Sequence, residues 1–205
     1  KMGYKRLSLF GLIGCFLFCG PLAAQAQQPG LSIGQSAPDF TGITYQGKSV
    51  DFYQDYLSQG PVVLVFYRGS WCHFCNLQLQ EYQQHFPEFQ ERGVTLLFVS
   101  VDKQEKAAAM VEEKAYSFDV IADPEAAILE AYNVIFQVPE ALATMYKERY
   151  KIDLQEASGR DDRVIAVPAT YVINQDGQIV YAYANENYKV RVTAEEILEI
   201  IDEKL

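Results

Sequence analysis

The sequence is poor in residues that bind soft metals and in positive charge. Its 205 residues include four cysteines and two histidines, and 17 basic against 27 acidic side chains give a formal net charge of −10. An acidic chain repels nucleic acid and anionic lipid, so we expect neither as a partner. A zinc site needs about four ligands. Outside the segment around Cys72 and Cys75 only His85 could supply one, so we expect no metal.

The remaining composition is that of an ordinary globular protein. Apolar residues make up 49% of the chain and charged residues 21%, which argues against a disordered chain. The length fits one domain with enough chain to bury a full core.

Residues 1–26 have the pattern of a cleaved secretory signal peptide. A basic start precedes an apolar stretch over residues 7–22, and Ala24-Gln25-Ala26 places small residues before a predicted cut after Ala26. We therefore expect an exported protein of the bacterial periplasm, with residues 27–33 as a short polar lead. Two alternatives stay open. One is an uncleaved membrane anchor, which usually needs about 20 apolar residues; the other is a lipid anchor on Cys15, because residues 12–15 resemble a lipobox.

Cleavage at this position would leave a single pair of thiols. Cys15 and Cys19 would be removed with the signal peptide, and Cys72 and Cys75 would remain. An exported chain that keeps two cysteines three positions apart points to that pair as its redox-active group.

Apolar runs and turn residues predict an α/β chain from residue 34 onward. The runs at 61–67 and 94–101 have the composition of strands buried on both faces. An N-terminal β-hairpin is expected to turn at 45–48, and a second hairpin to turn at Asn174-Gln175-Asp176-Gly177. Further strands are predicted at 118–121, 168–173 and 178–183, and helices at 51–57, 72–92 with an interruption at Pro87, 104–114, 123–132, 139–150 and from Thr193. This order predicts a central mixed sheet with helices on both faces and an insert of undefined role at about 134–164.

The cysteine pair lies at the predicted start of a helix. There the free backbone N–H groups and the helix dipole favour thiolate, the attacking species, so Cys72 is the expected nucleophile. Cys75, one turn further in, is the expected resolving thiol. Arg68 and His73 could add positive charge and lower the pKa of Cys72, although either could also be a solvated side chain. A structural disulfide is the alternative, but such bridges usually close longer loops.

Three segments together resemble a known family. They are Ala37-Pro38-Asp39-Phe40, the run from Phe66 to Cys75 (FYRGSWCHFC), and Val167-Pro168-Ala169-Thr170-Tyr171-Val172-Ile173. They are similar to thioredoxin-like redoxins, and more closely to the peroxiredoxin-like branch of the alkyl hydroperoxide reductase C and thiol-specific antioxidant (AhpC/TSA) family. The resemblance implies a thioredoxin-like fold over residues 34–205 and a cis-proline at Pro168, which would present the Val167 backbone to an extended substrate. The residues expected to shape the site around the pair are Arg68, Trp71, His73, Phe74, Val167, Pro168 and Thr170.

The sequence also departs from the peroxide-reducing members of that family. These carry a Pro-x-x-x-Thr/Ser-x-x-Cys pattern, which would put the proline at Arg68, the hydroxyl residue at Cys72 and the peroxidatic cysteine at Cys75. They also place an arginine where this chain has Pro168.

Three hypotheses follow for the function. The first is a thiol–disulfide oxidoreductase that uses the Cys72/Cys75 couple and needs no other cofactor. The second is a thiol peroxidase that reduces hydroperoxides, and the third is a non-catalytic redoxin-fold module that binds a partner. The enzyme hypotheses imply thiol or disulfide proteins or hydroperoxides as substrates and a dithiol reductant as a partner, and the sequence leaves the oligomeric state open.

Overall fold

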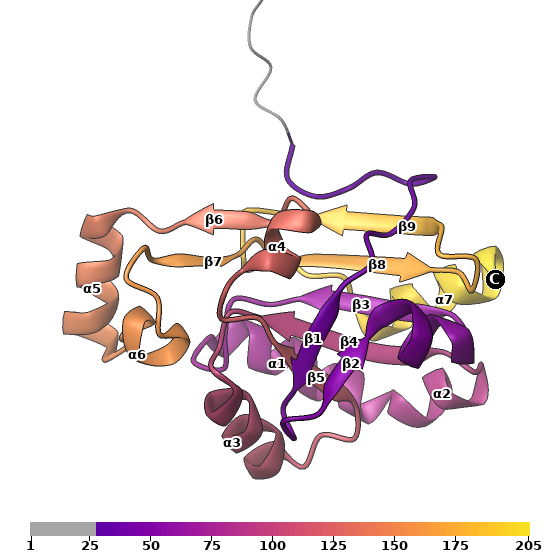
Figure 1. Cartoon of the computed structure of the whole chain (residues 1–205), viewed down its shortest axis with the longest axis horizontal. Coiled ribbons are helices and arrows are strands. Elements are labelled where there is room, and N and C mark those ends of the chain that lie inside the picture. Colours follow the sequence, from indigo (N-terminus) through magenta and orange to yellow (C-terminus); the bar gives the residue numbers. More distant parts are fainter. Residues whose placement is uncertain (1–27) are drawn as a thin grey trace, which may run out of the picture.

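A computed structural model describes residues 28–205 (Figure 1). The predicted signal peptide, with Cys15 and Cys19, lies outside the described residues. No helix in the part of the chain that is described is both long and apolar enough to cross a membrane.

The core of the fold is a seven-stranded mixed sheet in the order β2-β1-β5-β4-β3-β8-β9. The central strands β3, β4 and β5 are parallel. Strand β8 pairs antiparallel with β3, and β9 pairs antiparallel with β8. The N-terminal hairpin β1–β2 joins the opposite edge through β5. This arrangement confirms the predicted mixed sheet and N-terminal hairpin. The strands are β1 (Thr41–Thr44), β2 (Ser49–Asp51), β3 (Val62–Phe66), β4 (Thr95–Ser100), β5 (Asp119–Ala122), β8 (Ala169–Ile173) and β9 (Ile179–Ala184).

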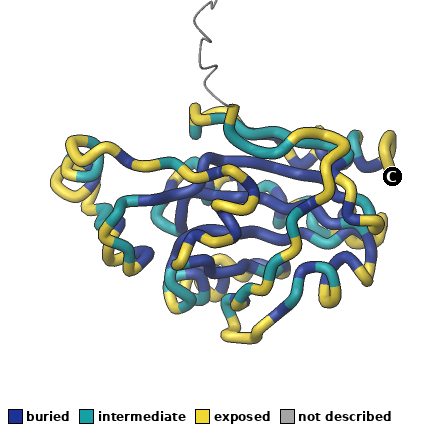
Figure 2. The backbone as a smooth tube through the Cα atoms, turned by 45° about the horizontal axis from the view of Figure 1, so that its top comes forward, coloured by how far each residue is buried: buried dark blue, intermediate teal, exposed yellow. Residues whose placement is uncertain are grey.

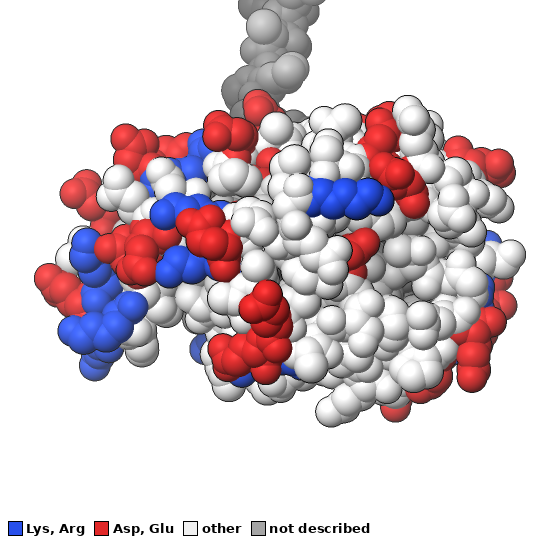
Figure 3. All heavy atoms as spheres, turned by 60° about the horizontal axis from the view of Figure 1, so that its bottom comes forward, with Lys and Arg blue, Asp and Glu red and all other residues white. Residues whose placement is uncertain are grey.

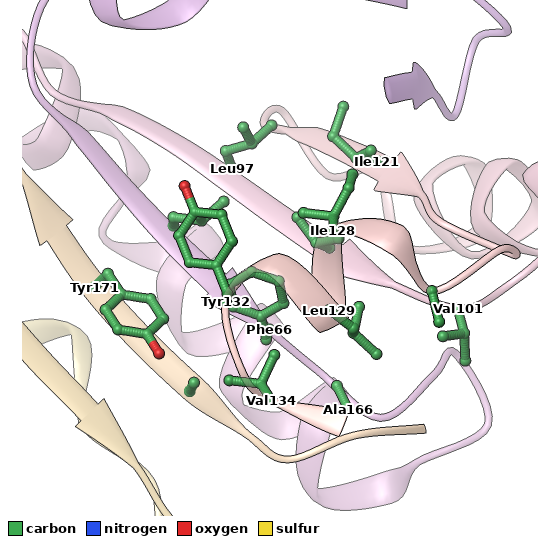
Figure 4. Close-up of a cluster of buried hydrophobic side chains, with 14 of the residues drawn as sticks. Phe66, Leu97, Val101, Ile121, Ile128, Leu129, Tyr132, Val134, Ala166 and Tyr171 are labelled. Carbon is green, nitrogen blue, oxygen red and sulfur yellow. The ribbon is translucent and has the colours of Figure 1, made fainter. Parts of the chain in front are cut away.

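Strand β3 is buried on both faces because it lies in the middle of the sheet. All five of its residues are 0% exposed, and they alternate between two separate apolar clusters. In one of these clusters the ring of Phe66 packs against Tyr132 and Tyr171 at centroid distances of 5.1 and 6.0 Å (Figure 4). Buried backbone accordingly runs through the centre of the molecule and exposed backbone lies around it (Figure 2).

Helices cover both faces of the sheet, as predicted. Helices α1 (His73–Gln84), α2 (Phe86–Glu91), α3 (Gln104–Lys114) and α7 (Ala194–Lys204) pack on the face that carries Val63 and Val65. The π-helix η1 (Phe52–Tyr56), the short 3₁₀ turn Leu57–Gln59 and α4 (Ala127–Ala131) pack on the face that carries Leu64 and Phe66. The predicted interruption near Pro87 is confirmed, because α1 ends before His85 and Pro87 occupies the first turn of α2.

The start of α4 differs from the prediction. We expected Asp123 as the N-cap and Pro124 as the first helical residue, but α4 begins at Ala127. The Asp123 carboxylate nevertheless accepts hydrogen bonds from the backbone N–H groups of Ala127, Ile128 and Leu129 at 2.9–3.1 Å. It caps the helix across a short turn because Ala126 adopts a left-handed conformation with φ of 58°.

The insert is a separate arm of the fold, at the left of Figure 1. Its strands β6 (Ile135–Gln137) and β7 (Val164–Ala166) pair with each other in an antiparallel ribbon outside the main sheet. The ribbon holds α5 (Glu140–Tyr150), which the sequence predicted, and α6 (Leu154–Ser158), which it did not. Helix α6 begins at Leu154 because the Asp153 side chain caps it and accepts the N–H groups of Gln155 and Glu156.

Candidate active site

Asp102, which follows β4, holds the turn between β3 and α1 by a hydrogen bond to its backbone. The buried Asp102 carboxylate accepts a hydrogen bond from the Ser70 N–H at 2.7 Å and one from the Ser100 hydroxyl at 3.1 Å. Gly69 has a φ of 147°, and a Cβ at this position would lie 3.0 Å from Asp102 Oδ1 and closer still to the Trp71 ring. Glycine is therefore required for the turn that carries Cys72 to the start of α1.

Cys72 and Cys75 lie where the sequence predicted them. Cys72 is the N-cap of α1, and its carbonyl accepts the N–H of Asn76 at 3.0 Å. Cys75 lies within the first turn of the helix and is 0% exposed, whereas 3% of Cys72 remains exposed. Both thiols are free, so the structure presents the reduced dithiol form of the pair.

The two thiols have pKa values shifted in opposite directions. A hydrogen bond from the Cys75 thiol, assisted by the positive charges of Arg68 and Arg191 and by the Cys75 N–H, outweighs burial and lowers the pKa of Cys72 to about 6. Burial, followed by the neighbouring Cys72, raises the pKa of Cys75 well above its usual value. At neutral pH the pair is therefore a Cys72 thiolate that accepts a hydrogen bond from the Cys75 thiol.

Arg68 supplies positive charge beside Cys72. Its Nη1 lies 3.9 Å from Cys72 Sγ, and its Nη2 donates a 2.7 Å hydrogen bond to the hydroxyl of Tyr146. The guanidinium also lies 4.1 Å from the ring centroid of Tyr188. The alternative of a solvated Arg68 is wrong: the residue is 5% exposed, because α5 and the segment before α7 cover it with aromatic side chains.

A second arginine, which the sequence analysis did not identify, approaches Cys75. Arg191, shortly before α7, has its Nη2 3.3 Å from Cys75 Sγ. No local pattern marks this residue, because 116 positions separate it from Cys75 and only the fold brings them together. Neither Arg68 nor Arg191 forms an ion pair with a carboxylate of residues 28–205, so both positive charges act on the sulfurs.

Three of the predicted site-shaping residues lie around Cys72. The half-buried Trp71 packs against Tyr146 with a ring distance of 6.0 Å, and Phe74 packs against Tyr188 at 5.6 Å. His73 is exposed at the first position of α1 and makes no hydrogen bond to Cys72 among the described contacts. Arg68, rather than His73, is the cation beside the outer sulfur.

The prediction of a cis-proline at Pro168 is wrong. Among the described residues there is no cis peptide bond, so Val167–Pro168 is trans. The two residues continue the extended chain from β7 into β8, where a trans bond is the ordinary state. The Val167 N–H donates to the carbonyl of Val134 at 2.7 Å and is not free to bind a substrate. Pro168 comes just before β8, whose first residue Ala169 pairs with Phe66 at the end of β3 that leads to Cys72. Thr170 is buried and pairs with Val65 of β3.

No group of three or more potential metal-binding side chains of the His, Cys, Asp or Glu type occurs within residues 28–205. What the site holds instead is a dithiol, two arginines and a set of aromatic rings. This arrangement can exchange a disulfide or transfer two electrons to another sulfur or oxygen electrophile.

Comparison with solved structures identifies proteins with the same fold. The chain is similar to peroxidoxin BcpB of Mycobacterium tuberculosis, with a TM-score of 0.65 and 17% identity over 86% of this chain and 98% of that one. It is also similar to a PrxQ variant of Xylella fastidiosa, with a TM-score of 0.66 and 18% identity over the same shares of the two chains. These likenesses confirm the thioredoxin-like α/β fold.

Sequence comparison places the chain among redox proteins. It is 26% identical over 130 residues, or 63% of this chain and 72% of the relative, to the thiol-disulfide oxidoreductase ResA of Bacillus cereus. It is 27% identical over 106 residues, or 51% of this chain and 69% of the relative, to alkyl hydroperoxide reductase E of Mycobacterium bovis. The family model of the AhpC/TSA family matches residues 33–182. The chain therefore belongs to the AhpC/TSA family, as the segments around Cys72 and Pro168 had indicated.

Proposed function

We propose that this protein is a thiol–disulfide oxidoreductase that works through the Cys72/Cys75 couple. The observation that carries the proposal is the arrangement of the two unbridged cysteines: each has its own arginine, and the outer one lies at the N-terminus of α1. Relatives named as thiol-disulfide oxidoreductases and as hydroperoxide reductases agree that the enzyme is an oxidoreductase.

The exchange proceeds in two steps. The Cys72 thiolate attacks one sulfur of a substrate disulfide, the substrate S–S bond breaks, and the other substrate sulfur leaves as a thiolate. Cys75 then loses its proton and attacks Cys72 Sγ, which releases the second substrate sulfur and leaves the Cys72–Cys75 disulfide. Two electrons pass from the protein to the substrate, and a dithiol partner has to return them. With the opposite redox poise the same steps run in reverse.

A thiol peroxidase is the second candidate. The Cys72 thiolate would attack one oxygen of a hydroperoxide, and the O–O bond would break with release of an alcohol or, from hydrogen peroxide, water. Cys75 would then condense with the sulfenic acid to form the disulfide and a molecule of water. The membership of the AhpC/TSA family and the Arg68 cation beside Cys72 Sγ favour this candidate. The missing Pro-x-x-x-Thr/Ser-x-x-Cys pattern argues against it, since Cys72 itself occupies the hydroxyl position.

We also propose that the protein is exported. The basic start, the apolar stretch over 7–22 and the small residues before Gln27 support this placement. N-terminal sequencing of the protein isolated from a periplasmic extract is expected to begin at Gln27. A lipid-modified Cys15 at the N-terminus, or an intact residue 1–26 segment in the membrane fraction, would overturn the cleavage.

One set of incubations separates the candidate functions. Reduced protein is mixed in turn with a protein disulfide such as oxidised insulin, with hydrogen peroxide and with an organic hydroperoxide, and the series is repeated with Cys72→Ser and Cys75→Ser. We expect turnover of the protein disulfide and a trapped mixed disulfide on Cys72 in the Cys75→Ser variant. Rapid stoichiometric peroxide consumption with no insulin turnover would favour the peroxidase. No reaction in any arm would leave the non-catalytic module.

A further inference from the structure

A pocket of about 290 Å³ opens directly beside Cys72. Its walls are dominated by five aromatic side chains, those of Trp71, Phe74, Tyr146, Tyr150 and Tyr188. Cys72 is part of the lining, so any group held in the pocket lies next to the attacking sulfur. Aromatic walls favour binding of an aromatic group, whose ring can pack edge-to-face or offset-stacked against them.

The insert builds one side of this pocket. Leu142, Met145 and Tyr146 extend from α5, and Ile152 follows the helix. Tyr150, at the end of α5, is 57% exposed although it is a large aromatic residue. The ribbon β6–β7 therefore positions an apolar helix face beside Cys72, where its side chains are open to a substrate.

The charges of the pocket decide which side chains it accepts. No acidic residue of the described chain lines it, and Arg68 is its strongest cation. A lysine or arginine side chain of a substrate would be repelled by Arg68 and would find no carboxylate in the pocket to pair with. A carboxylate would lose its hydration among apolar walls and compete with the Cys72 thiolate for Arg68. An uncharged apolar side chain meets neither penalty.

The size of the pocket points the same way. Small-molecule and cofactor sites commonly enclose roughly 300–1,000 Å³. A pocket of about 290 Å³ lies at the lower end of that range, which leaves room for one large side chain.

We propose that this pocket is a specificity site for a large apolar, preferably aromatic, side chain next to the reacting cysteine of a substrate polypeptide. The inference rests on the proposed thiol–disulfide exchange and adds the class of substrate. The bound ring anchors the substrate so that its disulfide sulfur lies against Cys72 Sγ, and the insert is the element that selects the substrate.

Three disulfide-linked peptides that differ at one position test the proposal. They carry Phe, Gly or Lys next to the cysteine, and the second-order rate constant of each with reduced protein is measured by stopped-flow. We expect the Phe peptide to react about tenfold faster than the Gly peptide, the order of discrimination that an apolar pocket provides, and the Lys peptide to react more slowly than either.

A matched pair of α5 variants assigns the preference to the pocket. Leu142→Ala removes a wall residue and is expected to reduce the Phe-to-Gly rate ratio several-fold. Thr144→Ala, an exposed position on the same helix that does not line the pocket, is expected to leave the ratio unchanged. Equal rates for the three peptides, or a ratio that Leu142→Ala leaves intact, would overturn the specificity site while exchange itself stands. No reaction with any peptide would instead contradict the proposed function.

Discussion

The two sulfurs of the dithiol are only three positions apart, yet their surroundings differ. Cys72 has the helix N-terminus, the Cys75 thiol and Arg68, whereas Cys75 is completely buried and has Arg191 at 3.3 Å. The outer sulfur is thus prepared to attack at neutral pH, and the inner one keeps its proton until a mixed disulfide has formed.

The pH dependence of alkylation tests the environment of Cys72. Because thiolate is the reacting form, the rate at which iodoacetamide modifies Cys72 is expected to rise with pH through a midpoint of about 6. Arg68→Met removes the nearby cation and is expected to move that midpoint upward. Arg149→Met, on the exposed surface of α5, is the control. Mass spectrometry of the modified peptide gives the rates, and an unchanged midpoint in Arg68→Met would contradict the role of Arg68.

Arg191 is expected to affect the second step more than the first, because its guanidinium contacts Cys75 and makes the smallest of the contributions that lower the pKa of Cys72. Its charge lowers the pKa of Cys75, so Arg191→Met raises that pKa and leaves less thiolate to resolve a mixed disulfide. A higher pKa also makes each thiolate a better nucleophile, so the net loss is about threefold for each unit of pKa. Reaction with dithiobis(nitrobenzoate) releases one thiolate per step, and the second release is expected to slow more than the first.

The conservative variant Arg191→Lys is the control for this prediction, because it keeps the charge. It is expected to recover part of the second-step rate. A slower first release in Arg191→Met, with the second release unchanged, would show that Arg191 acts on Cys72 instead.

The sequence identified the cysteine pair because its spacing and its place at a helix start are local patterns. It did not reveal the burial of Arg68 or the approach of Arg191. Tyr146 reaches Arg68 across 78 positions, and Arg191 reaches Cys75 across 116, so neither contact leaves a local pattern. The cis-proline was predicted only from the family resemblance, whereas Val167–Pro168 has the ordinary trans bond.

At the scale of elements, long apolar runs and helix caps were predictable, and short paired segments were not. Strands β3 and β4 and helix α3 follow from runs of five or more residues with one periodicity. Strands β6 and β7 have three residues each and exist only because each pairs with the other. A strand of this length has no periodicity of its own, so the sequence showed an insert but not the ribbon that supports α5.

The cap of α4 provides a stability prediction at this scale. Asp123→Ala leaves three N–H groups at the start of α4 without their acceptor and is expected to lower the free energy of unfolding by about 1 kcal/mol, as for other N-cap losses. Asp123→Asn keeps an acceptor oxygen and is expected to lose less. Urea unfolding of the reduced proteins at neutral pH measures both. Equal losses in the two variants would mean that the helix cap does not account for the effect.

At the scale of the whole molecule, the charge distribution sets the site apart from its surroundings. The chain carries a net charge of −10, and acidic side chains spread over the face in Figure 3, whereas basic side chains gather at the end that carries α5 and α6. Lys147 and Arg149 lie in the last turn of α5. Lys147 pairs with Asp153 at 2.8 Å, so the cations that lower the pKa of Cys72 and favour its thiolate are the two near the sulfurs, Arg68 and Arg191.

The same thiolate links the redox state to the stability of the whole fold. The pKa of Cys72 is about 6 in the folded reduced protein and about 8.5 for an ordinary unfolded cysteine. A lowered pKa stabilises the reduced fold fully above the unfolded value, and this stabilisation is lost as pH falls through 6. The oxidised protein has no thiolate and lacks this contribution, while carboxylates such as Asp102 titrate in both redox states and largely cancel in the difference.

We therefore expect the reduced form to gain stability relative to the oxidised form as pH rises. Between pH 5 and pH 7 the relative gain is about 1 kcal/mol, because one proton leaves the folded thiol but not the unfolded one. Urea unfolding of both redox forms at the two pH values measures the difference, and Arg68→Met is expected to reduce it. A difference that is independent of pH would show that Cys72 stays protonated in the fold. The buried Cys75 has no part in this range, since its raised pKa keeps it a neutral thiol in the reduced fold at both pH values.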